Sequence, residues 1–346
     1  MDRGDFINTH AEPVEYHVLR QAIQAKELPI LSIAVPTYKR FGLLKETLDS
    51  IFALDFSVPV EVLVVDNDPD SFELAYQELS RYGNHSFSYY KNIENLGMFG
   101  NWNQCLKLAK GKYVTILHDD DLLLPAFAAQ INALLHEGNT APAIIGFKVG
   151  ILDLRENRPV SVVKKLGILK RLLKRVVYGK ADLAVDSGAV DLFFSNLFCG
   201  TLGVVMNREM ALSIGGFNAE WYPIADYEFW CRWATHFGNI QVIQQEVGLY
   251  RMQQNQSLNL EVRKNYIKFS TALRLQMVAE HAVPHFLKYF IGVIARMQRK
   301  LVDLDWRTKD ASGSDSNSSF VFKGYKGYFS SSQTDMRLVP PSVKIL

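Results

Sequence analysis

Three consecutive carboxylates stand at the end of an apolar run, where the sequence reads YVTILHDDDLLLP over residues 113–125. Two unit charges about 4 Å apart repel by roughly 1 kcal/mol in water and by roughly 4 kcal/mol at a partly screened surface. We therefore expect a hard divalent cation, Mn²⁺ or Mg²⁺, held by one or two of Asp119, Asp120 and Asp121 and completed by substrate phosphate oxygens. In the alternative interpretation, one aspartate caps a helix that begins near Pro125 and the others are solvated.

A second acidic group follows another apolar run, VEVLVVDND at residues 60–68. A carboxylate there can accept hydrogen bonds from a ribose or a base edge, which makes Asp66 the predicted nucleoside contact. Asp68 fits a turn whose Asx side chain bonds its own backbone equally well. Lys39 and Arg40 follow the first apolar run and can meet phosphate. That run lacks G-x-G-x-x-G, which disfavours a dinucleotide oxidoreductase.

A third acidic position opens the aromatic segment DYEFWCRWATHF at residues 226–237, after a tight turn that Gly215 and Gly216 permit. A carboxylate near aromatic rings suits deprotonation of a sugar hydroxyl. Asp226 is therefore the candidate general base, and Glu228 is a weaker second candidate. The other interpretation is that Asp226 is simply a helix N-cap.

Hydrophobic periodicity predicts the elements that position these residues. Strand-like runs alternate with helically spaced segments, which is typical of a doubly wound α/β sheet that binds ligands at the carboxyl ends of its strands. The predicted strands in the first half are residues 28–38, 60–68, 87–91 and 112–117, and the helices are 42–54, 72–82 and 98–109. Further strands at 141–152, 201–207 and 239–252 and a helix at 226–237 are expected to continue one mixed sheet.

Composition limits the classes of function. The chain has 346 residues, of which 48% are hydrophobic, enough for one large α/β core or two modest ones. The balance of 38 basic and 36 acidic residues does not indicate a nucleic-acid binder. Cys105, Cys199 and Cys231 are odd in number and widely spaced, which argues against a disulfide framework or zinc site and favours a reducing cytoplasm. Neither a secretory signal nor a membrane-spanning run is predicted.

One segment stands out by charge: SVVKKLGILKRLLKRVVYGK at residues 161–180 holds seven Lys or Arg and no acidic residue. Its apolar residues recur at helical spacing, so it predicts a basic amphipathic helix. Such a helix can lie on an anionic membrane surface or dock to a partner. Alternatively, it packs its apolar face on the protein's own core. Residues 286–302 repeat the pattern more weakly.

Five ordered blocks resemble the inverting glycosyltransferases of family 2, which have the GT-A fold. These blocks are SIAVPTYKR, EVLVVDND, NLGMFGNWNQCLKLAKGKYVTILHDDDLLLP, IGGFNAEWYPIADYEFWCRW and LYRMQQNQS, within residues 29–258. The resemblance implies direct displacement at an anomeric carbon while a metal stabilises the departing nucleoside diphosphate. It implies a UDP-sugar donor, or a dTDP-sugar, and a glycan or lipid-linked acceptor in surface polysaccharide biosynthesis.

The resemblance also implies a role for each matching residue. Asp226 matches the base, and Asp120 and Asp121 match the metal-binding region. The residues implied for the nucleotide-sugar are Pro36, Thr37, Tyr38, Arg40, Asp66, Asn95, Gly97, Asn103, Asp119 and Asp120. Four positions depart from the family: His118 replaces a frequent Asp, Trp102 a frequent Arg, Ala225 a frequent Glu and Gln253 a frequent His.

The expected organisation is a lead at 1–28, a GT-A domain at 29–258, a helical extension at 259–308 and a flexible, partly disordered tail at 309–346. Within the domain we expect a nucleotide-binding half at 29–125 and an acceptor half at 140–258, with a basic insertion at 161–181. The insertion suggests peripheral contact with the inner face of the cytoplasmic membrane. Two other functions remain open: a catalytically silent sugar-nucleotide-binding scaffold of a polysaccharide assembly complex, and a nucleotidyltransferase.

Overall fold

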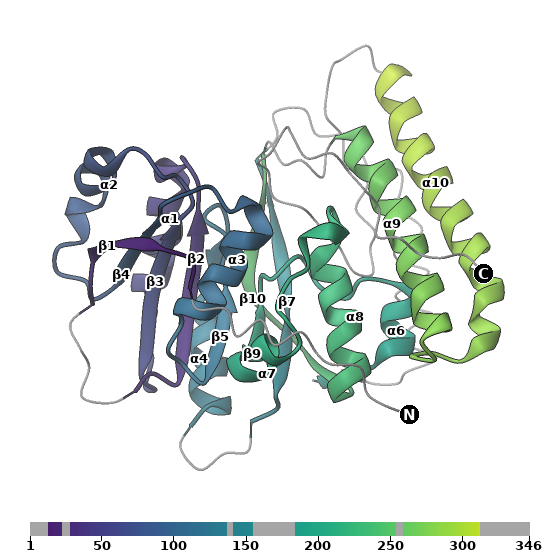
Figure 1. The fold of residues 1–346 in the computed structure, drawn as a ribbon, viewed down its shortest axis with the longest axis horizontal. Helices are drawn as coiled ribbons and strands as arrows, with labels where there is room; N and C mark the ends of the chain where they lie inside the picture. The colour runs from purple at the N-terminus through teal and green to yellow at the C-terminus, as the bar shows by residue number, and fades with distance from the viewer. Residues whose placement is uncertain (1–12, 23–27, 137–140, 155–183, 254–258, 312–346) are drawn as a thin grey trace.

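A computed structural model describes residues 13–22, 28–136, 141–154, 184–253 and 259–311, the last nine of these as backbone only (Figure 1). The basic segment predicted at 161–181 lies outside the described residues, as does the tail beyond residue 311. Among the described helices, none combines the length and hydropathy needed to cross a membrane.

One ten-stranded sheet runs through both halves of the chain, in the order β1-β4-β3-β2-β5-β9-β7-β10-β6, with β8 paired to β10. The mixed α/β fold predicted from the sequence is thereby confirmed. The strands are β1 (Tyr16–Arg20), β2 (Leu31–Thr37), β3 (Val60–Asp66), β4 (Ser88–Asn92), β5 (Tyr113–Ile116), β6 (Leu122–Leu123), β7 (Ile144–Asp153), β8 (Ala184–Ser187), β9 (Val204–Asn207) and β10 (Ile240–Met252).

The central strands β4, β3, β2 and β5 are parallel, and β9 joins them antiparallel to both β5 and β7. Every residue of β2 is buried, as expected of a strand covered on both faces. β1 pairs antiparallel with β4 at the sheet edge, so part of the predicted lead belongs to the fold.

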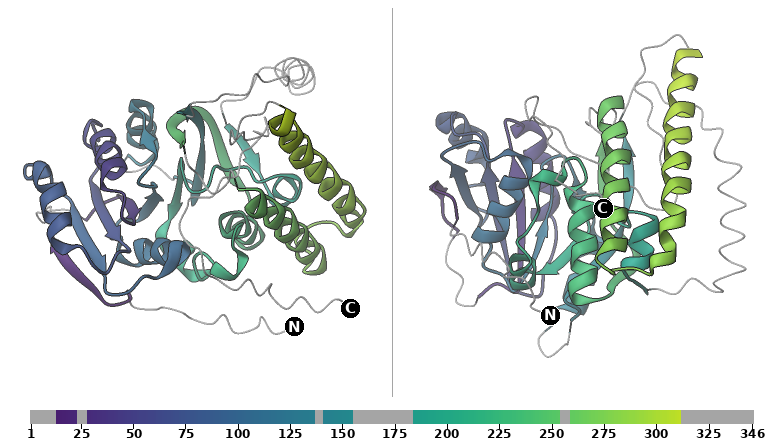
Figure 2. Two further views of the ribbon diagram at one scale, coloured as in Figure 1. Left: turned by 90° about the horizontal axis from the view of Figure 1, so that it is seen from above. Right: turned by 45° about the vertical axis from the view of Figure 1, so that its right-hand side comes forward.

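Helices cover both faces of the sheet (Figures 1 and 2). Apolar side chains of α1, α2 and α4 pack on one face with Ile33 and Val35 of β2. Those of α3, α6, α7, α8 and α9 form the core of the other face with Ala34. The helices are α1 (Phe41–Phe52), α2 (Phe72–Leu79), α3 (Gly97–Leu108), α4 (Pro125–Leu134), α6 (Ala189–Phe194), α7 (Arg208–Ser213), α8 (Ala225–Phe237), α9 (Leu260–Ala279) and α10 (Lys288–Ala311).

The two C-terminal helices, α9 and α10, lie side by side at the end of the molecule farthest from α2 (Figure 1). Phe269 and Met277 of α9 belong to the same buried core as Trp230 of α8, and Ile291 of α10 joins them. The helical extension is therefore part of the core of the second half.

The carboxyl ends of the parallel strands bring the acidic residues to one edge of the sheet. β2 and β3 are in register, with Thr37 opposite Asp66. Beyond β5, Leu117 still donates to the carbonyl of Ala34 at 2.9 Å, so residues 118–121 follow beside the end of β2. This is the edge where an open α/β sheet binds its ligands.

Candidate active site

The guanidinium group of Arg40 pairs with both Asp119 and Asp120. Arg40 donates to both oxygens of Asp119, and its Nη1 lies 3.1 Å from Asp120 Oδ2. Thr37 Oγ1 also donates to Asp119 Oδ2 at 2.7 Å. The repulsion within the acidic run is therefore offset in part by Arg40. The family resemblance had implied that Arg40 contacts the nucleotide-sugar. The capping alternative is wrong, because the N-cap of α4 is Leu124, which makes no side-chain cap.

The third carboxylate, Asp121, lies beside His118. Donor atoms of His118, Asp120 and Asp121 all lie within 4.8 Å of one another, and all three residues are buried. Asp121 Oδ1 accepts the backbone N–H of Arg251 at 3.1 Å, while Oδ2 receives no hydrogen bond. A buried carboxylate oxygen without a donor is costly, and a divalent cation would satisfy it, so these residues fit a metal.

The contact with Thr201 determines which ring nitrogen of His118 carries the hydrogen. The single hydroxyl hydrogen of Thr201 goes to the carbonyl of Ile116 at 2.8 Å, so its 3.2 Å contact with His118 Nε2 requires that nitrogen to be the donor. Nδ1 then carries the lone pair, 3.6 Å from Asp121 Oδ2. Burial lowers the pKa of His118 to about 4, which keeps the ring neutral. Neutral His118 is thus a further candidate metal ligand, at a position that the sequence analysis noted only as a departure from the family.

Trp102 closes one side of this cluster. Its ring stacks on His118 with centroids 4.8 Å apart and also contacts Phe217 at 5.2 Å. Burial, together with the negative charge of Asp120, raises the pKa of Asp121 well above its usual value. A bound cation would reverse that direction because it favours the ionised carboxylate.

Asp66 lies at the end of β3 with its oxygens already engaged. Lys91 Nζ and Tyr89 Oη each donate to Oδ2 at 2.7 Å, and the backbone N–H of Asp68 donates to Oδ1 at 3.0 Å. The register explains the pairing, because Lys91 of β4 lies opposite Asp66. The Asx turn expected at Asp68 is present, because its Oδ1 accepts the backbone N–H of Asp70 at 3.3 Å, and Asp66 makes the same kind of bond to Asp68. A nucleoside contact by Asp66 stays a prediction.

An asparagine network shapes the loop before α3. Asn95 Oδ1 accepts the backbone N–H of Gly97 at 2.9 Å and the amide of Asn67 at 2.8 Å. Gly97 has a φ of +71°, which glycine adopts without strain. Asn67, which the sequence did not single out, therefore supports the two residues predicted there. Pro36 and Thr37 are buried in β2, and Tyr38 is half-buried just beyond it.

Asn103, which was predicted to contact the nucleotide-sugar, forms two hydrogen bonds with the backbone of the loop before α8. Its amide donates to the carbonyl of Phe217 and accepts the N–H of the same residue, both at 2.8 Å. A Cβ on Gly216 would lie 2.3 Å from Asn103 Oδ1. The observed contacts of Asn103 therefore give it a structural role between α3 and α8.

Asp226 is buried at the start of α8, and one of its oxygens is without a partner. Oδ2 accepts the amide of Asn196 at 3.3 Å, whereas Oδ1 receives no hydrogen bond. Asn196 is itself oriented by the N–H of Phe198, which donates to its Oδ1 at 3.1 Å. Burial raises the pKa of Asp226 to about 7. The N-cap interpretation is wrong, since the N-cap of α8 is Ile224.

Glu228, the weaker candidate, is committed to Arg232. Its two oxygens accept from Arg232 at 2.7 and 2.9 Å, and Arg232 also donates to the backbone carbonyls of Ile214 and Gly216. This ion pair ties α8 to the double-glycine turn, where both glycines have positive φ as their sequence predicted. Asp226 is thus the carboxylate of α8 with an oxygen free to accept a proton.

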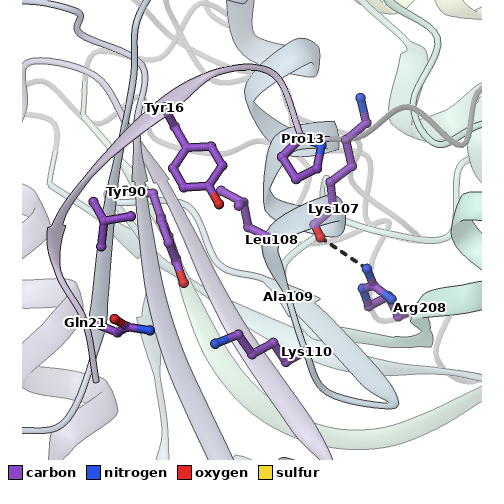
Figure 3. A pocket seen from close by; sticks show the side chains of 10 residues that line it. Pro13, Tyr16, Gln21, Tyr90, Lys107, Leu108, Ala109, Lys110 and Arg208 are labelled. Carbon is purple, nitrogen blue, oxygen red and sulfur yellow. Dashed lines mark hydrogen bonds between the residues drawn. The ribbon is translucent and has the colours of Figure 1, made fainter. Parts of the chain in front are cut away.

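A described pocket lies elsewhere, on the edge of the sheet that β1 and β4 form (Figure 3). It encloses about 500 Å³ between Tyr16, Tyr90, Leu108 and the C-terminal end of α3. Arg208 donates to the carbonyl of Lys107 at 3.1 Å beside it. None of the predicted site residues lines this pocket, so we do not assign it to the site.

Residues 32–193 match a family model described as glycosyl transferase family 2. Among curated proteins, an uncharacterized protein of Mycobacterium tuberculosis is 25% identical over 213 residues, which cover 59% of this chain and 61% of that protein. WcaA of Escherichia coli, named for colanic acid biosynthesis, is 32% identical over 100 residues, covering 29% of this chain and 36% of WcaA.

A third relative is the GalNAc(5)-diNAcBac-PP-undecaprenol beta-1,3-glucosyltransferase of Campylobacter jejuni. It is 33% identical over 112 residues, which cover 32% of this chain and 36% of that enzyme. The chain thus spans between 36% and 61% of the length of these three relatives.

Two solved structures share the fold. TarS of S. aureus superposes with a TM-score of 0.50 at 16% identity, covering 80% of this chain and 91% of that one. The mannosyltransferase PcManGT of Pyrobaculum calidifontis, solved with GDP-Man and Mn²⁺, gives 0.53 at 17% identity, covering 85% and 80%. Both are GT-A glycosyltransferases, so this sheet has the GT-A fold.

Proposed function

Because residues 32–193 match the family model of glycosyl transferase family 2, we propose that the chain transfers a sugar from a nucleoside diphosphate to an acceptor hydroxyl, with inversion and with a divalent metal. The donor is a UDP-sugar, with a dTDP-sugar as the alternative. The acceptor is a glycan or lipid-linked saccharide of surface polysaccharide synthesis, at the cytoplasmic face of the membrane. The names of the colanic acid and undecaprenol-linked relatives support this class of acceptor.

The observation that carries the proposal is that one short segment of the chain contacts both the candidate base and a candidate metal ligand. Asn196 donates to Asp226, and Thr201 contacts His118. The Cα atoms of Asn196 and Thr201 are at most about 18 Å apart, because they lie five residues apart in the chain. This closeness supports a candidate base and candidate metal ligands that act on one donor and one acceptor. The fold also supports the metal, because PcManGT was solved with GDP-Man and Mn²⁺.

The residues divide the reaction between them. Asp226 Oδ1 accepts the proton of the acceptor hydroxyl, whose oxygen forms the bond to the anomeric carbon. The bond from that carbon to the diphosphate breaks on the opposite side, and its electron pair leaves with the β-phosphate oxygen. His118 Nδ1, Asp120 and Asp121 would hold the cation, which supplies charge stabilisation for the departing diphosphate. Asn196 holds Asp226 Oδ2 so that Oδ1 stays available, and Trp102 excludes water from His118.

A ligand panel tests the donor half of the proposal. We expect one of UDP, GDP, dTDP and CMP to raise the midpoint of thermal unfolding with Mn²⁺ or Mg²⁺ but not with EDTA. Saturating a micromolar site adds a few kcal/mol of apparent stability, which is measurable. The absence of any metal-dependent shift would contradict the donor site. A shift without any turnover of matching donor and acceptor would favour the silent scaffold instead.

A further inference from the structure

Helix α10 and the short segment before it carry large apolar side chains that do not pack in the core. Five large side chains of the 286–297 stretch are between 45% and 74% exposed. They recur at helical spacing, and the ring of Phe290 extends the surface to the exposed Phe194 of α6, with centroids 6.1 Å apart. We name this surface the apolar face; it consists of Phe194, Phe286, Tyr289, Phe290, Val293 and Met297.

The apolar face is separate from the side of α10 that packs on the core. Leu287 and Ile291 are buried in the core of the second half, and Ala295 is also buried. At 100° per residue, these positions lie on a different side of the helix from Val293 and Met297. α10 is thus apolar on two sides, of which one stabilises the fold and the other faces solvent. An exposed patch of this kind indicates an interaction surface.

The charged side chains that the structure describes on α10 have one sign. Residues 286–302 contain Lys288, Arg296, Arg299 and Lys300 and no acidic residue, although the whole chain is nearly neutral at +2. Arg296 and Lys300 fall at helical positions next to Tyr289. A row of cations along one border of an apolar stripe is the pattern of helices that lie in the plane of a membrane interface.

We infer that the apolar face docks on an anionic lipid surface, with α10 parallel to the membrane and its basic residues at the headgroups. A second copy of this chain is the poorer occupant, because the same face would bring cations against cations. An acidic bilayer accepts both the apolar side chains and the charges. This inference does not rest on the proposed sugar transfer, since it needs neither donor nor acceptor.

Flotation of the full chain with phosphatidylglycerol vesicles tests the inference, with phosphatidylcholine vesicles alongside. We expect the protein to float with the anionic vesicles and the triple variant Tyr289→Ser, Val293→Gln, Met297→Gln to bind at least about tenfold more weakly. Arg296→Gln with Lys300→Gln should weaken binding roughly 30-fold, for two interfacial basic residues. These side chains are exposed, so thermal unfolding and the nucleotide-dependent shift should not change.

A control removes two exposed apolar side chains from the other end of the molecule. Leu74 and Tyr76 of α2 are 44% and 59% exposed, and Leu74→Ser with Tyr76→Ser should float like the wild type. The inference fails if the wild type does not float, or if the triple variant floats as well as the wild type, which would assign membrane contact to another segment. It also fails if the triple variant abolishes a dimer while vesicle binding is unchanged.

Discussion

At the scale of single residues, the two oxygens of Asp226 have different surroundings. Oδ2 is held by Asn196, while Oδ1 is buried without a donor. Burial raises the pKa of this carboxyl to about 7, which suits a base that works near neutral pH. Because only the ionised form accepts a proton, the transfer rate should rise with pH to half its maximum near 7 and level off above it. A pH profile of kcat/KM measures this.

Asn196 should act as a positioning residue that lowers the pKa of Asp226. The variant Asn196→Ala removes the hydrogen bond that favours the ionised carboxylate, so the rising limb of the profile should move to higher pH. The matched control is Asn132→Ala, because Asn132 bonds the backbone of Ser57 and Asp55 on the exposed side of α4. If both variants keep the wild-type profile, Asn196 does not position the base.

Asp226 should also lower the stability of the folded protein at neutral pH and above. Its pKa is raised on folding, so its contribution to stability is greatest below the unfolded pKa near 4 and is lost as pH rises through about 7. We expect Asp226→Asn to unfold at a higher temperature than the wild type at pH 8, with the difference vanishing near pH 4. Thermal unfolding across pH measures this, and a variant less stable at pH 8 would contradict the buried, donor-free position.

His118 should contribute directly to metal affinity. Its Nδ1 lone pair lies beside Asp121, and loss of one ligand in a cluster of three leaves too few protein donors. We expect His118→Ala and Asp121→Asn each to weaken Mn²⁺ binding by at least about tenfold in calorimetric titration without nucleotide. The control is Asp70→Asn, an exposed aspartate after β3. Equal affinity in His118→Ala and the control would remove His118 from the metal shell.

At the scale of elements, the turn between α7 and α8 depends on Gly216. Its φ is +66°, and a Cβ would lie 2.3 Å from Asn103 Oδ1, whereas neighbouring Gly215 has a φ of +87° and open space. Both substitutions with alanine cost left-handed backbone strain of about 1 kcal/mol. Only Gly216→Ala must also disturb the hydrogen bonds between Asn103 and the backbone of Phe217. We expect Gly216→Ala to lower the unfolding free energy by at least about 1 kcal/mol more than Gly215→Ala in urea titrations.

The long apolar runs made most elements predictable. Strands such as Leu31–Thr37 are buried on both faces, and that burial is visible as an uninterrupted apolar sequence. β1 was missed because YHVLR is a short, half-exposed edge strand inside a polar lead. Its pairing with β4 comes from tertiary contact, which periodicity cannot reveal.

The candidate site was predictable in its residue types but not in its partners. Strand alternation could not tell which carboxylates converge, because β5 ends at Ile116 and the chain turns, with Asp121 N–H bonding the carbonyl of His118 at 3.1 Å. Arg40 and Lys91 are counter-ions of Asp119 and Asp66 only in the folded chain. In the sequence, a basic residue that follows a strand is equally compatible with a phosphate contact and with an internal ion pair.

At the scale of the whole molecule, one sheet joins the predicted nucleotide-binding and acceptor halves. β9 pairs with both β5 and β7, and the segment before it carries Asn196 and Thr201, which reach the candidate base and the candidate metal ligands. The two predicted halves therefore share a core, and both contribute residues to the candidate site. Helix α10, which carries most of the apolar face, lies at the far end of the second half (Figure 2), where lipid contact would leave the predicted nucleotide-binding half unobstructed.

The most direct test of the account is to separate donor binding from transfer in Asp226→Asn. Release of nucleoside diphosphate from a panel of UDP- and dTDP-sugars is measured with a polyprenyl-diphosphate-linked saccharide as acceptor, beside the metal-dependent thermal shift. A general base contributes about 10²- to 10⁴-fold to the rate, so transfer should fall by that factor while the thermal shift stays that of the wild type. Full turnover by Asp226→Asn would contradict the assignment of Asp226 as the base.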